Sequence, residues 1–158
     1  MEFSGKKVTV VGTGISGIGA VGLLNAVGAE VVLYDGNEKL KIEDIEKKLG
    51  TYKAEIVLGE LTKELTDSSD LLVISPGVPI DSPVVKAFEA AGVPVWGEVE
   101  LAYAFDKGKV LAITGTNGKT TTTALVGQIV GAYHKDTFVV GNIGNPYTTE
   151  VLKRKKNS

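Results

Sequence analysis

Residues 6–35 read KKVTVVGTGISGIGAVGLLNAVGAEVVLYD and predict a strand, a glycine turn, a helix and a second strand. The apolar run from Lys6 to Gly12 is typical of a buried strand. Ile18 to Val27 continues as a helix that ends near Gly28, and Glu30 to Tyr34 is the second strand. This order of elements is the first half of a parallel α/β sheet.

The glycine turn carries a complete G-x-G-x-x-G motif, formed by Gly12, Gly14 and Gly17. Asp35 ends the second strand about twenty residues later, where a dinucleotide-binding fold places an acid on a ribose. The strand before the motif, the helix after it and this acid together favour a nucleotide site. On this half of the chain alone, an NAD-binding domain is the leading interpretation.

The chain as far as residue 105 continues to alternate strands and helices, which predicts a doubly wound parallel sheet with right-handed crossovers. A loop with the sequence SPGVP begins at Ser75, directly after an apolar strand, at the carboxyl edge where open α/β sheets bind ligands. The predicted elements are helix Lys41–Leu49, strands Ile56–Leu58 and Leu71–Ile74, a helix from Ser82 to Ala91, strand Val93–Trp96 and helix Glu98–Phe105.

Residues 110–130, VLAITGTNGKTTTTALVGQIV, begin a second unit of strand, glycine loop and helix. Glycines allow backbone N–H groups to turn toward a phosphate at the start of a helix, and Lys119 adds a positive charge. Thr120 offers the hydroxyl that a P-loop gives to Mg²⁺, and Thr121 is placed to bind a neighbouring phosphate. The loop is two residues shorter than the Walker pattern.

Further elements follow this loop, and the chain divides into two predicted domains. The segment Phe138 to Gly141 is predicted as a strand with GNIG as its loop, and Pro146 to Lys155 as a helix. We expect residues 1–97 to form a Rossmann-like domain. We expect residues 98–158 to form the start of a P-loop ATPase-type α/β domain, whose strands and helices pack on the first domain or are loosely ordered.

The composition excludes several classes of protein. The chain has 158 residues, 43% of them hydrophobic and 23% charged, with a net charge of -2. This balance favours neither a nucleic-acid partner nor a membrane surface. The sequence contains no cysteine, so disulfides and thiolate metal sites are excluded. The N-terminal apolar run is too short for a signal peptide, and we expect a monomer in the cytoplasm.

The short loop GTNGKTT resembles the ATP loop of the Mur ligase superfamily, ATP-dependent enzymes that join amino acids to the peptidoglycan precursor. Thr120 stands where the related folylpolyglutamate synthetases usually have glycine. Asn117 points to the D-glutamate-adding branch or its diamino-acid-adding relative. The motifs GTGISG, ISPGVP, GEVELA, GTNGKTTTT and GNIGNP then follow the order and spacing of the D-glutamate-adding branch from about Lys6 to Pro146.

The resemblance implies that the first domain holds the uridine diphosphate of UDP-N-acetylmuramoyl-L-alanine rather than NAD. Asn37 departs from the pattern, because some family members have an arginine there that pairs with phosphate. The positions that match the family's UDP pocket are Gly14, Ile15, Ser16, Asp35, Gly36, Asn37, Ser75, Pro76, Gly77 and Asn142. Those that match its ATP loop are Gly115, Thr116, Asn117, Gly118, Lys119, Thr120 and Thr121.

The resemblance also implies a mechanism. ATP phosphorylates the alanyl carboxylate of the substrate, and the amine of D-glutamate attacks the acyl phosphate. Lys119 and Thr120 are the implied catalytic residues, with Thr120 acting through Mg²⁺. The family's metal-binding glutamate and C-terminal domain are implied to lie beyond Ser158, so we expect a fragment that binds the UDP substrate without catalysis.

Two other interpretations stay open from the residues themselves. The first is an NAD(P)-binding oxidoreductase module with an unrelated P-loop extension. The second is a non-catalytic nucleotide sensor that uses both loops. Parallel binding of UDP compounds, NADH and ATP distinguishes the three.

Overall fold

The computed structural model describes residues 3–141 and 145–153, and a sheet of five parallel strands forms its core. The strand order is β3-β2-β1-β4-β5, so the chain first builds the sheet to one side of β1 and then to the other. This is the doubly wound α/β sheet that the alternation of elements predicts. The strands are β1 Lys7–Val11, β2 Glu30–Asp35, β3 Glu55–Leu58, β4 Leu71–Ile74 and β5 Val95–Gly97.

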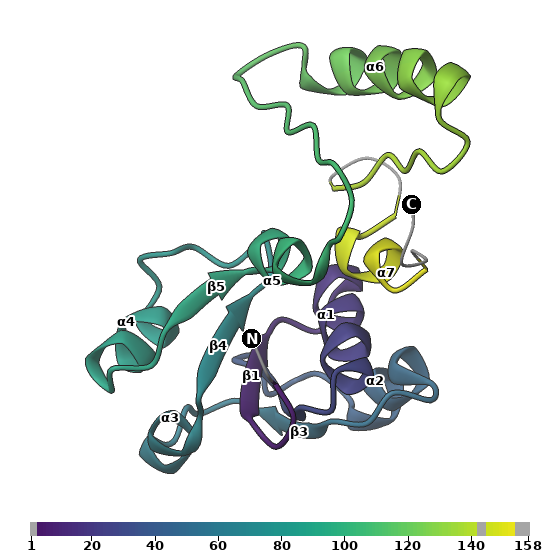
Figure 1. Ribbon diagram of the computed structural model, residues 1–158. Coiled ribbons are helices and arrows are strands. Elements are labelled where there is room, and N and C mark those ends of the chain that lie inside the picture. Colours follow the sequence, from purple (N-terminus) through teal and green to yellow (C-terminus); the bar gives the residue numbers. More distant parts are fainter. Residues whose placement is uncertain (1–2, 142–144, 154–158) are drawn as a thin grey trace.

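Helices cover both faces of this sheet (Figure 1). One apolar cluster joins α1, α2, α5 and α7 to the sheet, and the other joins α3 and α4 to its opposite face. No described helix is both long enough and apolar enough to cross a membrane. The helices are α1 Ile15–Ala26, α2 Ile42–Leu49, α3 Lys63–Ser68, α4 Pro83–Ala90, α5 Glu98–Phe105, α6 Lys119–Tyr133 and α7 Tyr147–Val151.

The two apolar clusters explain why the central strands are apolar at almost every position. Successive side chains of a strand point to opposite faces, so Val8 and Val10 enter the cluster under α1 while Val11 enters the other. Thr9 is the polar exception in β1, and its buried hydroxyl lies 2.8 Å from the hydroxyl of Ser69. A helix that the sequence analysis does not predict, α3, begins where the hydroxyl of Thr62 accepts a hydrogen bond from the Leu65 N–H.

Two predicted strands of the second unit are absent from the described residues. Val110–Ile113 and Phe138–Gly141 are extended segments outside any sheet, and the only bridge that the described residues form here joins Val140 to Asn145. A strand is stabilised by the ladder of hydrogen bonds to a neighbour, and the described residues provide no such ladder for these segments. Leu111 is accordingly 69% exposed. The prediction of strands from apolar character alone was wrong at both places.

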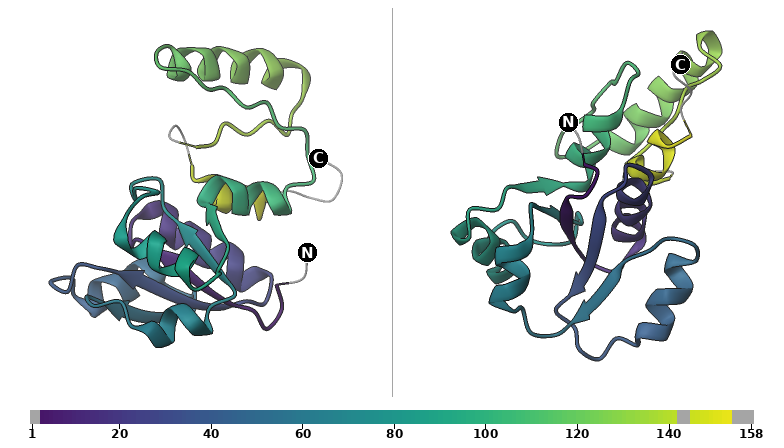
Figure 2. Two further views of the ribbon diagram at one scale, coloured as in Figure 1. Left: turned by 90° about the vertical axis from the view of Figure 1, so that its left-hand side faces the viewer. Right: turned by 60° about the horizontal axis from the view of Figure 1, so that its bottom comes forward.

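The predicted helix after the glycine loop is present as α6, but it contributes nothing to the core. All fifteen residues of α6 are described, and none of them is buried. Figures 1 and 2 show α6 lying away from the sheet, at the far end of a long extended segment that leaves α5. Leu125 and Ile129, on the expected apolar face, are each more than half exposed.

The last described helix, α7, packs against α1 and α5. It is shorter than the predicted helix and ends at Val151, while residues 154–158 lie outside the described part. Thr148 donates from its amide and its hydroxyl to Oε1 of Glu98 on α5, at 3.2 and 2.9 Å, and both residues are buried. Gly19 of α1 provides the space, because a Cβ atom there would lie 2.7 Å from the Thr148 hydroxyl.

Thr148→Val is expected to destabilise the protein by about 1–3 kcal/mol, because the buried Glu98 carboxylate loses its hydroxyl donor. The measurement is urea unfolding followed by the fluorescence of Trp96, the single tryptophan. Thr149→Val is the matched control, since Thr149 lies on the same helix and is half-buried. Equal unfolding midpoints for Thr148→Val and the control would contradict this role of Thr148.

Candidate functional site

Three loops meet at the carboxyl edge of the sheet, because three neighbouring strands end at the same level. In the sheet register Val11 of β1 pairs with Tyr34 of β2 and with Ile74 of β4. The glycine turn, the loop after Asp35 and the loop that begins at Ser75 follow these three residues directly. The structure therefore brings together the described residues that the sequence analysis assigns to the UDP pocket; Asn142 lies outside the described residues.

The glycine turn is packed tightly onto the start of α1. Gly12 has a φ of 104°, which favours glycine, and Gly14 is the N-terminal cap of α1. At Gly17 a Cβ atom would lie 1.9 Å from the carbonyl oxygen of Gly12, so no other residue fits this geometry. Ile15, the first residue of the helix, is 80% exposed and available to a ligand.

The carboxylate of Asp35 is held by backbone and side-chain donors. Its Oδ2 accepts hydrogen bonds from the amide and the hydroxyl of Thr13, at 3.2 and 3.0 Å. Its Oδ1 accepts a hydrogen bond from the amide of Asn37, at 3.1 Å. The sequence analysis assigns Thr13 no role. The sequence feature that could have identified Thr13 is its position between Gly12 and Gly14, in the turn next to the strand that ends at Asp35.

Ser75 lies against the glycine turn. A Cβ atom at Gly12 would lie 2.9 Å from the Ser75 hydroxyl oxygen, and that hydroxyl is buried with no hydrogen-bond partner among the described residues. A buried hydroxyl without a partner costs free energy, which makes Ser75 a candidate for a ligand contact. Pro76 and Gly77, which follow it, are exposed.

Tyr34 forms a side-chain hydrogen bond at this edge of the sheet. Its hydroxyl donates to the carbonyl of Gly59 at 2.8 Å, which links the ends of β2 and β3. Burial, and then the neighbouring Asp35 carboxylate, raise the pKa of Tyr34, so the phenol stays protonated and able to donate.

The predicted phosphate loop lies apart from these three loops, at the start of α6 (Figure 1). Gly118, with a φ of 74°, is the N-terminal cap of the helix. The Lys119 ammonium is folded back onto the loop, where it donates to the carbonyls of Gly115 and Thr116. Thr120 and Thr121 are exposed, as are Thr116 and Asn117. The loop thus presents its lysine and hydroxyl groups to solvent.

The residues around Thr120 match a Mg²⁺ site only in part. Mg²⁺ prefers six oxygen ligands, supplied by carboxylates, phosphates and water. Within the described ranges, no group of three His, Cys, Asp or Glu residues is placed to hold a metal ion. Among the described residues, the chain therefore offers the Thr120 hydroxyl here without a cluster of carboxylates beside it.

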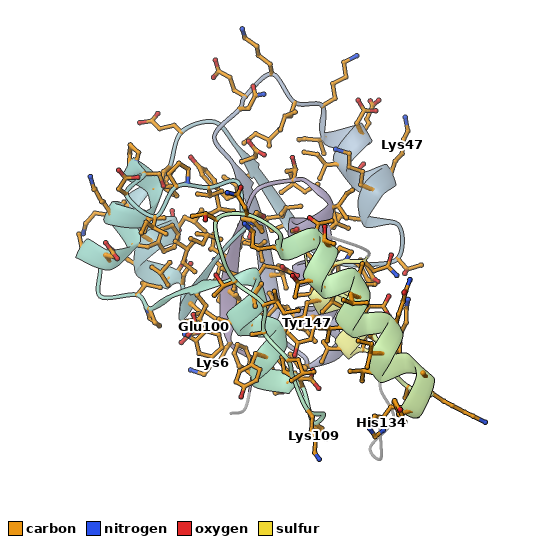
Figure 3. All side chains as sticks on the ribbon, turned by 90° about the horizontal axis from the view of Figure 1, so that it is seen from above. Lys6, Lys47, Glu100, Lys109, His134 and Tyr147 are labelled. Atoms are coloured by element: carbon orange, nitrogen blue, oxygen red, sulfur yellow. The ribbon has the colours of Figure 1, made fainter. Side chains whose placement is uncertain are left out.

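A groove of about 570 Å³ lies between α6 and the two extended segments, and none of the predicted site residues lines it. Val126 and Val130 of α6, with Phe138, give it apolar walls, and Tyr147 of α7 also lines it. Figure 3 labels Tyr147, and shows His134 at the C-terminal end of α6. His134 is exposed and has no acidic cluster around it in the described chain.

A family model, described as the N-terminal domain of MurD-like Mur ligases, matches residues 6–97. The UDP-N-acetylmuramoylalanine--D-glutamate ligase of Lachnospira eligens is 66% identical over 158 residues, which is all of this chain and 35% of that protein. The enzyme of the same name from Lachnoclostridium phytofermentans is 55% identical over 159 residues, again 100% of this chain and 35% of that protein.

The solved structures include a similar fold, that of a pseudomurein peptide ligase type C from Methanothermus fervidus. The TM-score is 0.55 at 24% identity, and the match covers 92% of this chain and 31% of that one. The chain spans about a third of the length of the curated relatives it matches.

Proposed function

The chain belongs to the family of MurD-like Mur ligase N-terminal domains, and from this we propose that it is the substrate-holding part of an ATP-dependent ligase. The proposed reaction adds D-glutamate to UDP-N-acetylmuramoyl-L-alanine in the cytoplasm, through an acyl phosphate. Residues 1–97 hold the uridine nucleotide, and residues 98–158 supply the phosphate loop for ATP and Mg²⁺.

One observation carries the proposal: the identity to D-glutamate ligases extends over the whole chain, beyond the 6–97 range of the family model. The match to these relatives therefore spans both the loops at the sheet edge and the phosphate loop. An NAD(P)-binding oxidoreductase module would need only the loops at the sheet edge. The geometry supports the same assignment, because Ser75 presents a buried hydroxyl that has no partner among the described residues, beside the glycine turn.

The two proposed functions, binding of the uridine nucleotide and binding of ATP, lie at two separate sites. At the carboxyl edge of the sheet, Ser75 donates or accepts a hydrogen bond with the nucleotide, and Asp35 accepts one. At the start of α6, Lys119 moves from the carbonyls of Gly115 and Thr116 to the phosphates of ATP. Mg²⁺, when bound, neutralises charge on those phosphates. ATP transfers its phosphoryl group to the alanyl carboxylate, and the amine of D-glutamate displaces phosphate.

This division predicts that the 158-residue chain binds UDP but neither hydrolyses ATP nor performs ligation. Calorimetry with UDP, UDP-N-acetylmuramoyl-L-alanine and NADH measures ligand binding. A phosphate-release assay measures ATP hydrolysis. We expect Asp35→Ala and Ser75→Ala to weaken UDP binding about tenfold each, which corresponds to one lost hydrogen bond of about 1.4 kcal/mol.

Ser82→Ala is the matched control for Ser75→Ala. The Ser82 hydroxyl is also buried without a described partner, but Ser82 is the N-terminal cap of α4, at the far end of the loop that begins at Ser75. The control should bind UDP as the wild type does. Binding of NADH in preference to UDP compounds would contradict the proposed function. Phosphate release above background would contradict only the prediction that the 158-residue chain does not hydrolyse ATP.

A further inference from the structure

The Asp35 carboxylate accepts three hydrogen bonds from its own chain, and this limits what it can offer a ligand. A carboxylate has about four acceptor positions, two on each oxygen. The amide and hydroxyl of Thr13 fill both positions on Oδ2. The amide of Asn37 fills one on Oδ1. About one acceptor position is left, and it is on Oδ1.

Thr13 is also the residue that joins two of the three loops. It lies in the glycine turn after β1, while Asp35 ends β2. Thr13 is 6% exposed and Asp35 is half-buried, so the hydroxyl bond between them is partly shielded from water. A hydrogen bond to a charged acceptor contributes more when it is shielded. This bond therefore fixes the orientation of the carboxylate, while a backbone hydrogen bond from the Gly12 amide to the Tyr34 carbonyl, at 2.9 Å, already joins the ends of β1 and β2.

We propose that Thr13 is a positioning residue of the nucleotide site, which holds the Asp35 carboxylate so that only Oδ1 accepts a hydrogen bond from the ligand. The inference rests on the proposed function, since the ligand is a uridine nucleotide. A ligand group with a single N–H or O–H donor fits this arrangement. A ribose diol that uses both carboxylate oxygens, as a dinucleotide does, would have to displace Thr13.

The test is calorimetry of UDP binding to Thr13→Val and Thr13→Ser. Valine keeps the shape of the side chain and removes the hydroxyl, so we expect UDP affinity to fall about tenfold. Serine keeps the hydroxyl, and we expect binding within about twofold of the wild type. Because Thr13 acts through Asp35, the loss caused by Thr13→Val should disappear when Asp35 is already alanine.

Thr9→Val is the matched control. Thr9 lies in β1, and its buried hydroxyl is also hydrogen-bonded, to Ser69, but it is not part of the nucleotide loops. Thermal unfolding of Thr9→Val and Thr13→Val measures the structural cost of each change. We expect both variants to lose stability and only Thr13→Val to lose UDP affinity.

The outcomes distinguish this inference from the proposed function. If the wild type does not bind UDP, both are overturned. If the wild type binds UDP and Thr13→Val binds it equally well, only the role of Thr13 is overturned. That role is also overturned if serine does not rescue binding, if the loss persists beside Asp35→Ala, or if Thr9→Val weakens binding as much. If Asp35→Ala binds UDP too weakly to measure, the comparison of Thr13→Ser with Thr13→Val decides the role of Thr13.

Discussion

Lys119→Ala, in a chain that spans the full length of its relatives, is expected to lower the rate of ligation about 10²- to 10³-fold. In the proposed function, the lysine is the cation that the phosphate loop provides to the phosphoryl group in transfer. Loss of one preorganised charge partner costs about 10²- to 10³-fold in turnover. In the structure the Lys119 ammonium already lies on the loop, bound to the carbonyls of Gly115 and Thr116. Steady-state phosphate release in the presence of both substrates measures the effect.

Binding of UDP should survive this change, because the three loops at the sheet edge do not include Lys119. Lys86→Ala, which removes an exposed lysine of α4, is the matched control and should ligate at the wild-type rate. Turnover by Lys119→Ala close to that of the control would refute the role of the lysine. Loss of UDP affinity in the same variant would show that the two sites are not separate.

Gly17→Ala is expected to be the most damaging small substitution in the first domain. The added Cβ atom would lie 1.9 Å from the Gly12 carbonyl oxygen and 3.3 Å from the Ser75 hydroxyl. The first of these is a backbone atom, so relief requires the glycine turn or α1 to move. We expect a loss of about 3 kcal/mol in the free energy of unfolding. UDP affinity should be lost with it, since the turn is part of the proposed UDP site.

Gly14→Ala is the matched control for stability, because it is in the same motif and a Cβ atom there meets nothing within 4 Å. Thermal unfolding of the two variants side by side measures the difference. Equal melting temperatures would mean that the turn yields easily and that close packing is not the reason for glycine at position 17.

Local patterns in the first domain were sufficient to predict its fold. Apolar runs such as Leu71–Ile74 identify strands that are buried on both faces, and glycines with defined spacing identify the turn. The strands find their hydrogen-bonded partners within the 6–97 range, so local prediction and strand pairing agree. α3 escaped prediction because its six residues give no clear apolar period, although Thr62 marked its start.

The same kind of pattern misled in the second unit. Val110–Ile113 is as apolar as β4, yet it forms no strand, because a strand exists only with a hydrogen-bonded neighbour and the described residues supply none. The helix after the glycine loop did form as α6, since its hydrogen bonds are internal to the segment.

The sequence by itself determined the α/β class, the positions of the glycine turn, Asp35, Ser75 and the phosphate loop, and the resemblance that implies their ligands. Each depends on residue type and spacing along the chain. Only the tertiary structure decided that the Thr13 hydroxyl donates a hydrogen bond to the Asp35 carboxylate. It also decided that the Ser75 hydroxyl is buried without a partner among the described residues, and that α7 packs on α1 and α5. These are contacts between residues distant in sequence, and their geometry depends on how the strands pair and the helices pack.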